Sequence, residues 1–374
     1  MSSSSFLNTV IFLAAGLLSY GLGFFLIRLS RRLNFLDYPG DRKIHPQPVP
    51  FMGGMGVFVS FWSVILAGIV LAFFFDDRIP FLKVHDDLVS GIRFLTPQVL
   101  GIFWGSFIIL VVGFLDDKFR WPPIQKMLGQ FVAIAVLLGP GFRINLAADW
   151  QVVGYLITFI WVFLIINAFN FIDSLDGHCA GIALISSLMF FWIVQIIRQP
   201  LDGFLLIAFA GALFGFLFHN FKRDKMFLGD NGSLFIGYMM AAFTLLSQYH
   251  EPQSTLATTF IPVLIFGVPI YDTVSVVAVR ILRGIPPWKG DRNHFAHRLV
   301  KIGMSQKVAV IFSYFIAFAI GHIAILTTQV NAFGAVLIGV IFVSILGMIA
   351  FLEFYVTREI TMKRKRALEA VSKP

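Results

Sequence analysis

The sequence predicts an all-α integral membrane protein, a polytopic bundle of about 11 (10–11) transmembrane helices, from three observations. Hydrophobic residues make up 58% of the 374 residues and charged residues only 13%, which is about half the charged share of an average soluble domain. Apolar runs long enough to cross a bilayer recur along the whole chain. Lysine and arginine gather in alternate connections between those runs, as they do in the cytoplasmic loops of membrane proteins.

The apolar runs follow one another so closely that no connection could hold a separate soluble domain. We therefore expect one transmembrane domain over residues 1–357 and a basic cytoplasmic tail over residues 358–374, whose Lys363–Arg366 segment contacts anionic headgroups. The expected helices lie near residues 6–27, 52–74, 98–115, 124–140, 152–171, 179–197, 203–219, 232–249, 257–279, 308–328 and 333–356.

The orientation follows from the basic residues. The connections after the first, third, fifth, seventh and ninth runs, together with the tail, carry all 29 Lys and Arg residues except Arg78, Lys83, Arg93, Arg143 and Arg198. The positive-inside rule places that side in the cytoplasm. We expect the N-terminus outside, the C-terminus in the cytoplasm, and a multi-pass protein of the cell inner (cytoplasmic) membrane. The net charge of +9 then reflects topology and lipid contact, so no nucleic-acid partner is predicted.

Five polar stretches fall on this predicted cytoplasmic face. Each combines carboxylates, amides or basic side chains next to an apolar run, where ionisable groups are costly and usually functional. The stretches are LDYPGDRKIHPQPVPFMGG (36–54), GFLDDKFRWPP (113–123), NAFNFIDSLDGH (167–178), NFKRDKMFLGDNGS (220–233) and GDRNHFAHRL (290–299). Their restriction to one side indicates a functional site at the membrane surface.

Five acidic residues of these stretches, Asp116, Asp117, Asp173, Asp176 and Asp230, would repel one another unless a cation lay among them. Oxygen ligands without clustered cysteine or histidine indicate Mg²⁺, with Mn²⁺ as the alternative, and Mg²⁺ commonly shares its site with substrate phosphates. Neighbouring Lys and Arg side chains suit phosphate contacts. The stretches therefore predict a phosphorylated substrate.

Each motif taken singly is also compatible with a solvated helix end or with a polar contact between helices. Two other classes of protein fit the set less well. A transporter would carry polar residues near mid-membrane and internal repeat symmetry, and a non-enzymatic scaffold would not need carboxylates in several motifs on one face. Asp272 lies inside an apolar run, so it requires a partner whether its role is structural or functional.

Taken in order, the motifs resemble those of the polyprenyl-phosphate N-acetylhexosamine-1-phosphate transferases, enzymes of the glycosyltransferase family 4 type. GFLDDKFRWPPIQKMLGQ resembles the Asp-Asp motif followed by the Lys and Gln of the next helix, NAFNFIDSLDG the Asn- and Asp-rich motif, and GDNGS the Gly-Asp-x-Gly-Ser segment. DYPGDRKIHPQPVPFMGG resembles the first cytoplasmic loop and DRNHFAHRL the last, His-rich loop. The resemblance covers about residues 37–301. It implies ten or eleven membrane helices, a catalytic role for the domain over 1–357, and an active site on the cytoplasmic face.

Two branches of this family differ in their sugar donor. One uses UDP-N-acetylmuramoyl-pentapeptide for peptidoglycan, and the other uses UDP-N-acetylglucosamine or a related UDP-N-acetylhexosamine for O-antigen, teichoic acid or similar glycans. VPFMGGMGVF, DRNHFAHRL and VKIGMSQKVAV look more like the second branch. Ser174, His178 and Ala296 depart from the family pattern, which leaves the details of sugar recognition open.

The resemblance implies transfer of a sugar-1-phosphate, first of all GlcNAc-1-phosphate, to undecaprenyl or another polyprenyl phosphate. The products are polyprenyl-diphosphate-sugar and UMP, and a homodimer is among the assemblies it allows. Phospho-N-acetylmuramoyl-pentapeptide transfer is the alternative reaction.

Matching the motifs assigns roles to individual residues. The resemblance implies a metal site at Asp230 with Asn170 beside it, and a base or a positioning group at Asp116 or Asp117. The helix that carries Asn167 should break near Ser174 to Gly177, which would turn Asp176 back into the site. The implied catalytic residues are Asp116, Asp117, Asp173, Asp176 and Lys126, and the implied substrate-binding residues are Asp37, Lys43, Asn167, Asn170, Phe227 (by stacking on uracil), Gly229, His294, His297 and Arg298.

Overall fold

The computed structural model describes residues 3–39, 47–75, 88–144, 150–221, 226–246, 260–287 and 293–371. The chain divides into two compact units, Met1–His250 (unit 1) and Glu251–Pro374 (unit 2). In the described part of the chain both units are built from helices, with one pair of two-residue strands in unit 1. The predicted all-α membrane class is therefore confirmed.

Unit 1 begins with a long helix, a short strand pair and a second helix. Strands β1 (Leu36–Asp37) and β2 (Val49–Pro50) pair antiparallel, with Asp37 opposite Val49. Proline stands in the first turn of both α4 and α7, where its missing N–H leaves no helical hydrogen bond unmade. The helices of this unit are α1 (Ser3–Arg32), α2 (Gly53–Phe75), α3 (Leu88–Phe119), α4 (Pro123–Leu138), α5 (Gln151–Ile172), α6 (His178–Ile196), α7 (Pro200–Asn220) and α8 (Asp230–Leu246).

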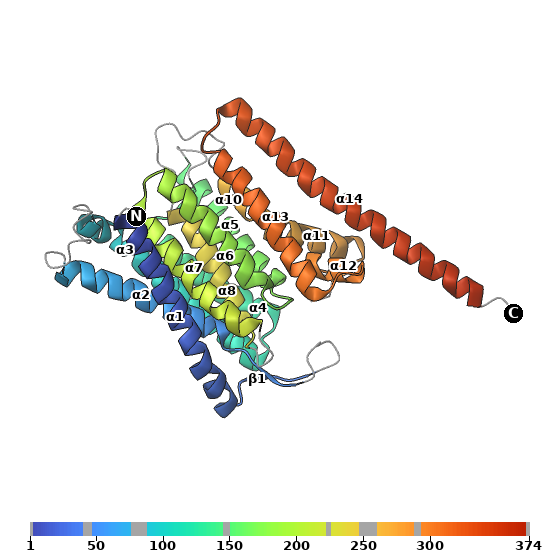
Figure 1. Ribbon diagram of the computed structural model, residues 1–374, viewed down its shortest axis with the longest axis horizontal. Coiled ribbons are helices and arrows are strands. Elements are labelled where there is room, and N and C mark those ends of the chain that lie inside the picture. The colour runs from blue at the N-terminus through green and yellow to red at the C-terminus, as the bar shows by residue number, and fades with distance from the viewer. Residues whose placement is uncertain are drawn as a thin grey trace. The chain divides into compact units, whose positions relative to one another are not determined.

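Helix α8 forms the buried centre of unit 1 (Figure 1). Every residue from Asn231 to Leu245 is buried, and the helix packs against α2, α3 and α5. The outer helices instead expose apolar side chains such as Leu17 on α1 and Val152 on α5, as expected of surfaces that face lipid. Because its neighbours enclose α8, they also fix the position of its first residue, Asp230.

The segment in front of α8 is tied to the start of α2. The Phe227 N–H donates to the Pro50 carbonyl oxygen at 2.7 Å. In return, the N–H groups of Gly53 and Gly54 donate to the carbonyl oxygens of Phe227 and Leu228, each at 3.1 Å. The residues that lead into Asp230 are therefore held by backbone hydrogen bonds.

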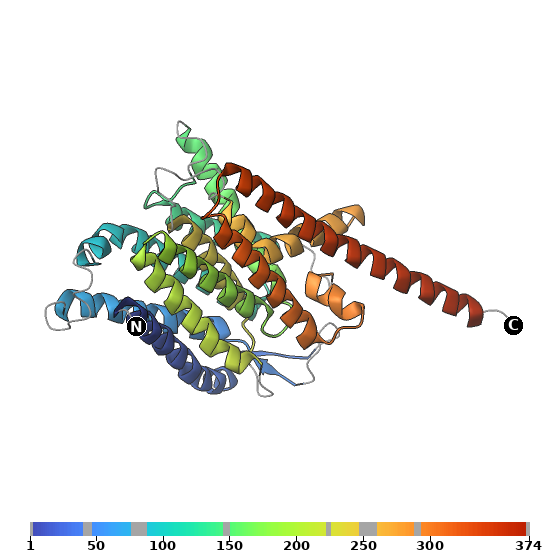
Figure 2. The same cartoon turned by 45° about the horizontal axis from the view of Figure 1, so that its top comes forward.

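Unit 2 packs short helices against one long helix. Helices α10, α11 and α12 contact α13, and the buried side chains of Phe295, Leu299, Ala309 and Ile349 form a core cluster. Helix α14 is one continuous helix of 40 residues that runs past residue 357 (Figure 2). The helices of this unit are α10 (Ile261–Ile265), α11 (Gly267–Leu282), α12 (Phe295–Lys301), α13 (Gln306–Leu326) and α14 (Ala332–Val371).

Eight of the described helices are long and apolar enough to cross a membrane, namely α1, α2, α3, α5, α6, α7, α13 and α14. Helices α4 and α8 are shorter, with 16 and 17 residues. The run expected near 257–279 includes two helices, α10 and α11, which meet at Phe266. The chain is thus a multi-pass membrane protein, but the expected count of about eleven spans is not confirmed, and the orientation of the termini stays a prediction.

Candidate active site

Four helix ends of unit 1 bring polar side chains together. Asp116 and Asp117 lie in the last turn of α3, and Lys126 lies in the first turn of α4. Asn170 lies in the last turn of α5, and Asp230 is the first residue of α8. These residues come from three separate parts of the sequence. The fold links the side chains of Asp116, Asn170 and Asp230 through Lys126, while Asp117 bonds to the backbone at the start of α8.

Lys126 lies at the centre of this carboxylate cluster. Its Nζ is 3.0 Å from Asp116 Oδ2 and 3.0 Å from Asp230 Oδ2, and it donates to Asn170 Oδ1 at 3.3 Å. The lysine side chain is only 17% exposed and that of Asp116 10%, whereas that of Asp230 is 34% exposed. One ammonium group therefore balances two carboxylates, and Asp230 is the more accessible of the two.

Asn170 connects α5 to the first turn of α8. Its Nδ2 donates to Asp230 Oδ1 at 2.5 Å and to Ser233 Oγ at 2.8 Å. Together with the Lys126 contact, these bonds engage both ends of the Asn170 amide. The carboxylate of Asp230 is thus held from one side by Asn170 and from the other by Lys126.

The two consecutive aspartates of α3 have different partners. Asp116 Oδ1 accepts the Trp121 N–H at 2.9 Å, which closes the chain reversal between α3 and α4. Asp117 instead accepts from the N-terminus of α8, namely from the N–H groups of Asp230 at 2.9 Å and Asn231 at 3.0 Å. Asp116 therefore belongs to the Lys126 cluster, and Asp117 caps α8.

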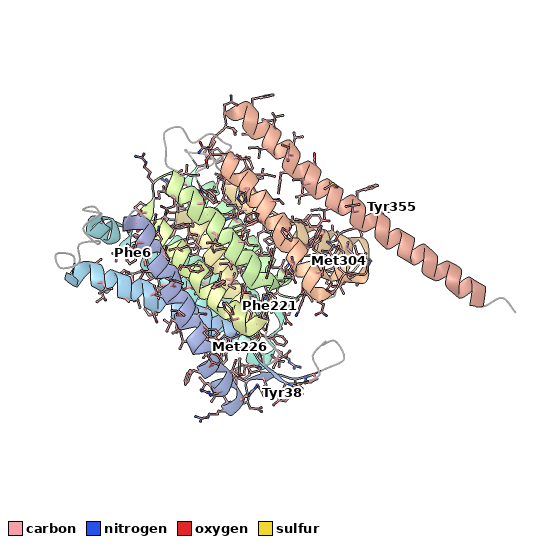
Figure 3. All side chains as sticks on the ribbon, in the orientation of Figure 1. Phe6, Tyr38, Phe221, Met226, Met304 and Tyr355 are labelled. Atoms are coloured by element: carbon pink, nitrogen blue, oxygen red, sulfur yellow. The ribbon has the colours of Figure 1, made fainter. Side chains whose placement is uncertain are left out.

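The helix break predicted near Ser174 to Gly177 is confirmed. Helix α5 ends at Ile172, and α6 starts at His178 after a turn whose last residue, Gly177, has φ +75°. A Cβ on Gly177 would lie 2.0 Å from the ring of Phe221, so both backbone and packing require glycine there. The Gly177 N–H donates to Asn220 Oδ1 at 2.5 Å. Asn220 is the last residue of α7, and Figure 3 labels the next two residues that the structure describes, Phe221 and Met226.

This turn carries two further carboxylates of the site. Desolvation by burial, followed by the negative charges of Asp230, Asp117 and Asp176, raises the pKa of Asp173 well above its usual range. These interactions place Asp173 within electrostatic reach of the carboxylate cluster, and Asp176 within reach of Asp173. Both acidic residues therefore lie at the end of unit 1 that holds the carboxylate cluster, and Asp173 gains a negative charge there less readily than an isolated aspartate does.

The remaining sequence-predicted residues of unit 1 have other surroundings. Asn167 Nδ2 donates to Gln130 Oε1 at 2.9 Å, so its amide links α5 to α4. Gly229 has φ +76°, Phe227 is half-buried, and Asp37 lies in β1. Lys43 lies outside the described residues.

In unit 2, the predicted histidine loop is held by a network of its own. Buried Asp272 finds its partner in His294, with Asp272 Oδ2 2.8 Å from His294 Nδ1, and it also accepts the Phe295 N–H. Arg298 donates to Glu353 Oε1 at 2.9 Å and to Ser275 Oγ at 2.8 Å. Its third nitrogen donates to the Asn293 carbonyl oxygen at 2.5 Å. His297 lies in α12 and is half-buried.

The sequence predicted no role for Asn231 or Ser233, and it indicated Gln130 only as part of a motif, although each bonds to a predicted site residue. Asn231 and Ser233 lie in the quoted GDNGS stretch, and Gln130 lies four residues after Lys126, on the same face of α4. These positions in the sequence could have indicated that the three residues lie near the site. Which side chain each one bonds to depends on how the helices pack.

The donor set of the carboxylate cluster fits a hard divalent cation. Oxygens of Asp116, Asp230 and Asn170 all converge on the Lys126 ammonium, so they already surround a positive charge. Within the described residues, no group of three or more His, Cys, Asp or Glu side chains is gathered as a self-sufficient metal site. Mg²⁺ does not need one, because it usually takes one or two protein carboxylates and completes its shell with water and substrate phosphates.

Comparison with known proteins identifies relatives of the chain. The model of glycosyl transferase family 4 matches residues 99–248, which include Asp116, Lys126, Asn170 and Asp230. A probable undecaprenyl-phosphate N-acetylglucosaminyl 1-phosphate transferase of Bacillus subtilis is 32% identical over 78% of this chain and 76% of its own length.

Two other relatives are more distant. The decaprenyl-phosphate N-acetylglucosaminephosphotransferase of Mycolicibacterium smegmatis is 29% identical over 81% of this chain and 77% of its own length. The undecaprenyl-phosphate alpha-N-acetylglucosaminyl 1-phosphate transferase of Escherichia coli K12 is 24% identical over 86% of this chain and 82% of its own length.

Proposed function

The chain belongs to glycosyl transferase family 4, and on that premise we propose that it transfers N-acetylglucosamine-1-phosphate from UDP-N-acetylglucosamine to a polyprenyl phosphate. The products are polyprenyl-diphosphate-N-acetylglucosamine and UMP. The observation that carries the proposal is the Lys126 ammonium held between Asp116 and Asp230 where four helices end. The names of the relatives support the transferred group and the class of acceptor.

A site at helix ends suits both substrates. The polyprenyl chain of the acceptor stays in the bilayer while its phosphate reaches the membrane surface, and the nucleotide-sugar arrives from water. We propose that these helix ends lie at the cytoplasmic face of the inner membrane, because the loops on this side carry most of the Lys and Arg residues.

The attacking group is a phosphate oxygen of the acceptor. A phosphate monoester has its second pKa at about 6, so near neutral pH it is mostly a dianion and needs little help from a base. It attacks the phosphorus attached to the sugar, a new P–O bond forms, and the P–O bond to the UMP phosphate breaks. One diphosphate linkage is formed for each one broken, so the reaction should be readily reversible.

The main task of the protein is to bring two anions together. Lys126 is the cation of the cluster, and we propose that its ammonium contacts the reacting phosphates. Asp116 keeps that ammonium in place from α3, and Asp230 does so from α8. Asp173 and Asp176 line the nucleotide side of the site in this proposal.

We propose Mg²⁺ as the cofactor, held by Asp230 with Asn170 beside it. When bound, the ion would neutralise charge on the diphosphate. The amide of Asn170 can present its oxygen to a cation in place of its NH₂ group by rotating half a turn. The 34% exposure of the Asp230 side chain leaves it accessible to solvent and ligand.

In unit 2, we keep His294 and His297 as proposed substrate contacts. Arg298 is better suited to hold the loop that carries them, because its donors go to Glu353, Ser275 and Asn293. In this proposal, His294 and His297 contact the substrate and Arg298 holds them in place.

The donor can be tested with the purified protein in detergent, undecaprenyl phosphate and Mg²⁺. UDP-N-acetylglucosamine, UDP-N-acetylgalactosamine and UDP-N-acetylmuramoyl-pentapeptide are offered separately, and UMP release is measured with and without EDTA. We expect UMP from UDP-N-acetylglucosamine only when Mg²⁺ is present. UMP from the pentapeptide donor alone would assign the chain to the peptidoglycan reaction instead. UMP release that is unchanged in EDTA would show that the reaction does not need the proposed metal.

A further inference from the structure

We propose that Asn231 and Asp117 form a latch that positions the first residue of α8, so that Asp117 acts through Asp230 and not directly on substrate. This inference rests on the proposed function, because it assigns the two aspartates of the Asp-Asp motif to different tasks in the same reaction. Asp116 binds the Lys126 ammonium, whereas Asp117 and Asn231 together hold Asp230 in place.

Asn231 binds two other segments of unit 1, the end of α3 and the start of α2. Its Nδ2 donates to Asp117 Oδ2 of α3 at 2.6 Å and to the Phe51 carbonyl oxygen, just before α2, at 2.9 Å. Its Oδ1 accepts the Met55 N–H in the first turn of α2 at 3.1 Å. The residue is 1% exposed, and its amide joins the ends of α2, α3 and α8.

Asp117 completes the latch by capping α8. The first N–H groups of a helix have no partner within the helix and need an acceptor from elsewhere. The Asp117 carboxylate accepts two of them, those of Asp230 and Asn231, in addition to the Asn231 amide. Since Asp230 is the first residue of α8, this cap directly sets the place from which its carboxylate reaches Lys126 and Asn170.

The packing around the latch leaves little room for another arrangement. Gly229, with φ +76°, lies against it, and a Cβ there would be 2.6 Å from Asn231 Nδ2 and 2.7 Å from Asp117 Oδ2. A misplacement of about 1 Å at a reacting centre can cost roughly 100-fold in rate. A latch this close to Asp230 is therefore expected to matter for turnover, although its side chains do not form the Lys126 cluster.

The inference is tested by exchanging the two side chains. Asn231→Asp places a second carboxylate against Asp117 and the Phe51 carbonyl oxygen, and we expect kcat to fall about 100-fold with a smaller change in KM. Asp117→Asn in the same chain restores an amide–carboxylate pair. We expect the double variant N231D/D117N to recover to within about tenfold of the unaltered protein.

Asp116→Asn is the matched control, because it makes the same chemical change one residue earlier in the motif. Its combination with N231D should recover nothing, because Asp116 bonds to Lys126 and Trp121 and not to Asn231. If D117N and N231D/D117N were equally inactive while N231D kept nearly full activity, Asp117 would act on substrate directly and the inference would be overturned.

The thermal midpoint of the protein, measured without substrate, separates this inference from the proposed reaction. We expect N231D to lower the midpoint and N231D/D117N to raise it again, whichever substrate the protein uses. A protein that releases no UMP but shows this recovery would contradict the proposed function and retain the latch. If N231D does not fold, Asn231→Ala replaces it, and D117N must then have a smaller effect in the N231A background than alone; equal effects in both backgrounds would contradict the latch.

Discussion

The polar clusters of the two units differ in how their charges are balanced. In unit 1, the single ammonium of Lys126 is shared by Asp116 and Asp230. The negative charge of Asp230 also repels the carboxylate of Asp173. In unit 2, the ion pairs found within the described residues match one acid to one base, Asp272 to His294 and Glu353 to Arg298.

This difference indicates what each cluster is for. A surplus of buried or half-buried carboxylates costs free energy unless a further cation joins them, so the cluster in unit 1 is suited to bind a metal ion and, through that ion, a substrate phosphate. Matched pairs need no ligand. Those of unit 2 hold α12 and the residue before it to α11 and α14, and so fix where His294 and His297 lie.

The largest expected effect comes from Asp230→Asn in unit 1. The change removes the accessible carboxylate of the cluster and nearly preserves its shape, so UMP release should fall about 1,000-fold, while the thermal midpoint changes little. Steady-state UMP assays and thermal unfolding of the same preparation measure both quantities. If the variant kept a tenth of the original activity, the proposed role of Asp230 at the reacting phosphates would be contradicted.

The next effect concerns the shared cation. Lys126→Met leaves Asp116 and Asp230 without their ammonium, so we expect about 100-fold lower kcat and a lower thermal midpoint in EDTA. Mg²⁺ should restore most of the midpoint but not the activity, because a divalent cation can replace the ammonium between the same oxygens. The matched control is Lys118→Met, an exposed lysine on α3. A midpoint that does not respond to Mg²⁺ would count against a cation site here.

A comparable change in unit 2 should act mainly on stability. Asp272→Asn weakens the bond to His294 and the bond from the Phe295 N–H, both buried, so we expect a loss of about 2 kcal/mol in the free energy of unfolding. Denaturant unfolding in detergent, followed by fluorescence, measures it. If D272N were as stable as the original protein, the contrast drawn between the two clusters would be wrong.

The smallest effect is a dependence of stability on pH. The raised pKa of Asp173 means that the folded state holds this proton more tightly than the unfolded chain does. Its contribution is therefore fully present below the unfolded pKa of about 3.9 and is lost as the pH rises through the folded pKa. Asp173→Asn in EDTA should thus be more stable than the original protein at high pH, with the difference vanishing near pH 4. A difference that grows towards low pH would have the opposite sign and contradict this assignment.

The sequence predicted those features that depend on local pattern. The membrane class, the helix break after Ile172 and the presence of polar residues at the ends of α3, α5 and α8 all follow from hydrophobic runs and their boundaries. The sequence predicted that the motifs carrying Asp116, Lys126 and Asp230 gather on one face. The structure shows that Lys126 lies between the two aspartates and contacts both.

Other features depend on tertiary packing and could not be read from one chain. The pairing of Asn167 with Gln130 and the partner of Asp272 join residues from different helices. The number of spans cannot be fixed from apolar runs alone, because α4 and α8 are apolar but short, and composition does not tell a buried helix from a spanning one.

Isotope exchange tests most directly whether a reversible phosphate transfer takes place at the carboxylate cluster of unit 1. Labelled UMP is incubated with unlabelled UDP-N-acetylglucosamine, the polyprenyl-diphosphate product, Mg²⁺ and the purified protein. We expect label to enter UDP-N-acetylglucosamine with the original protein and to stay in UMP with D230N. No exchange by the original protein, or equal exchange by D230N, would contradict this proposal.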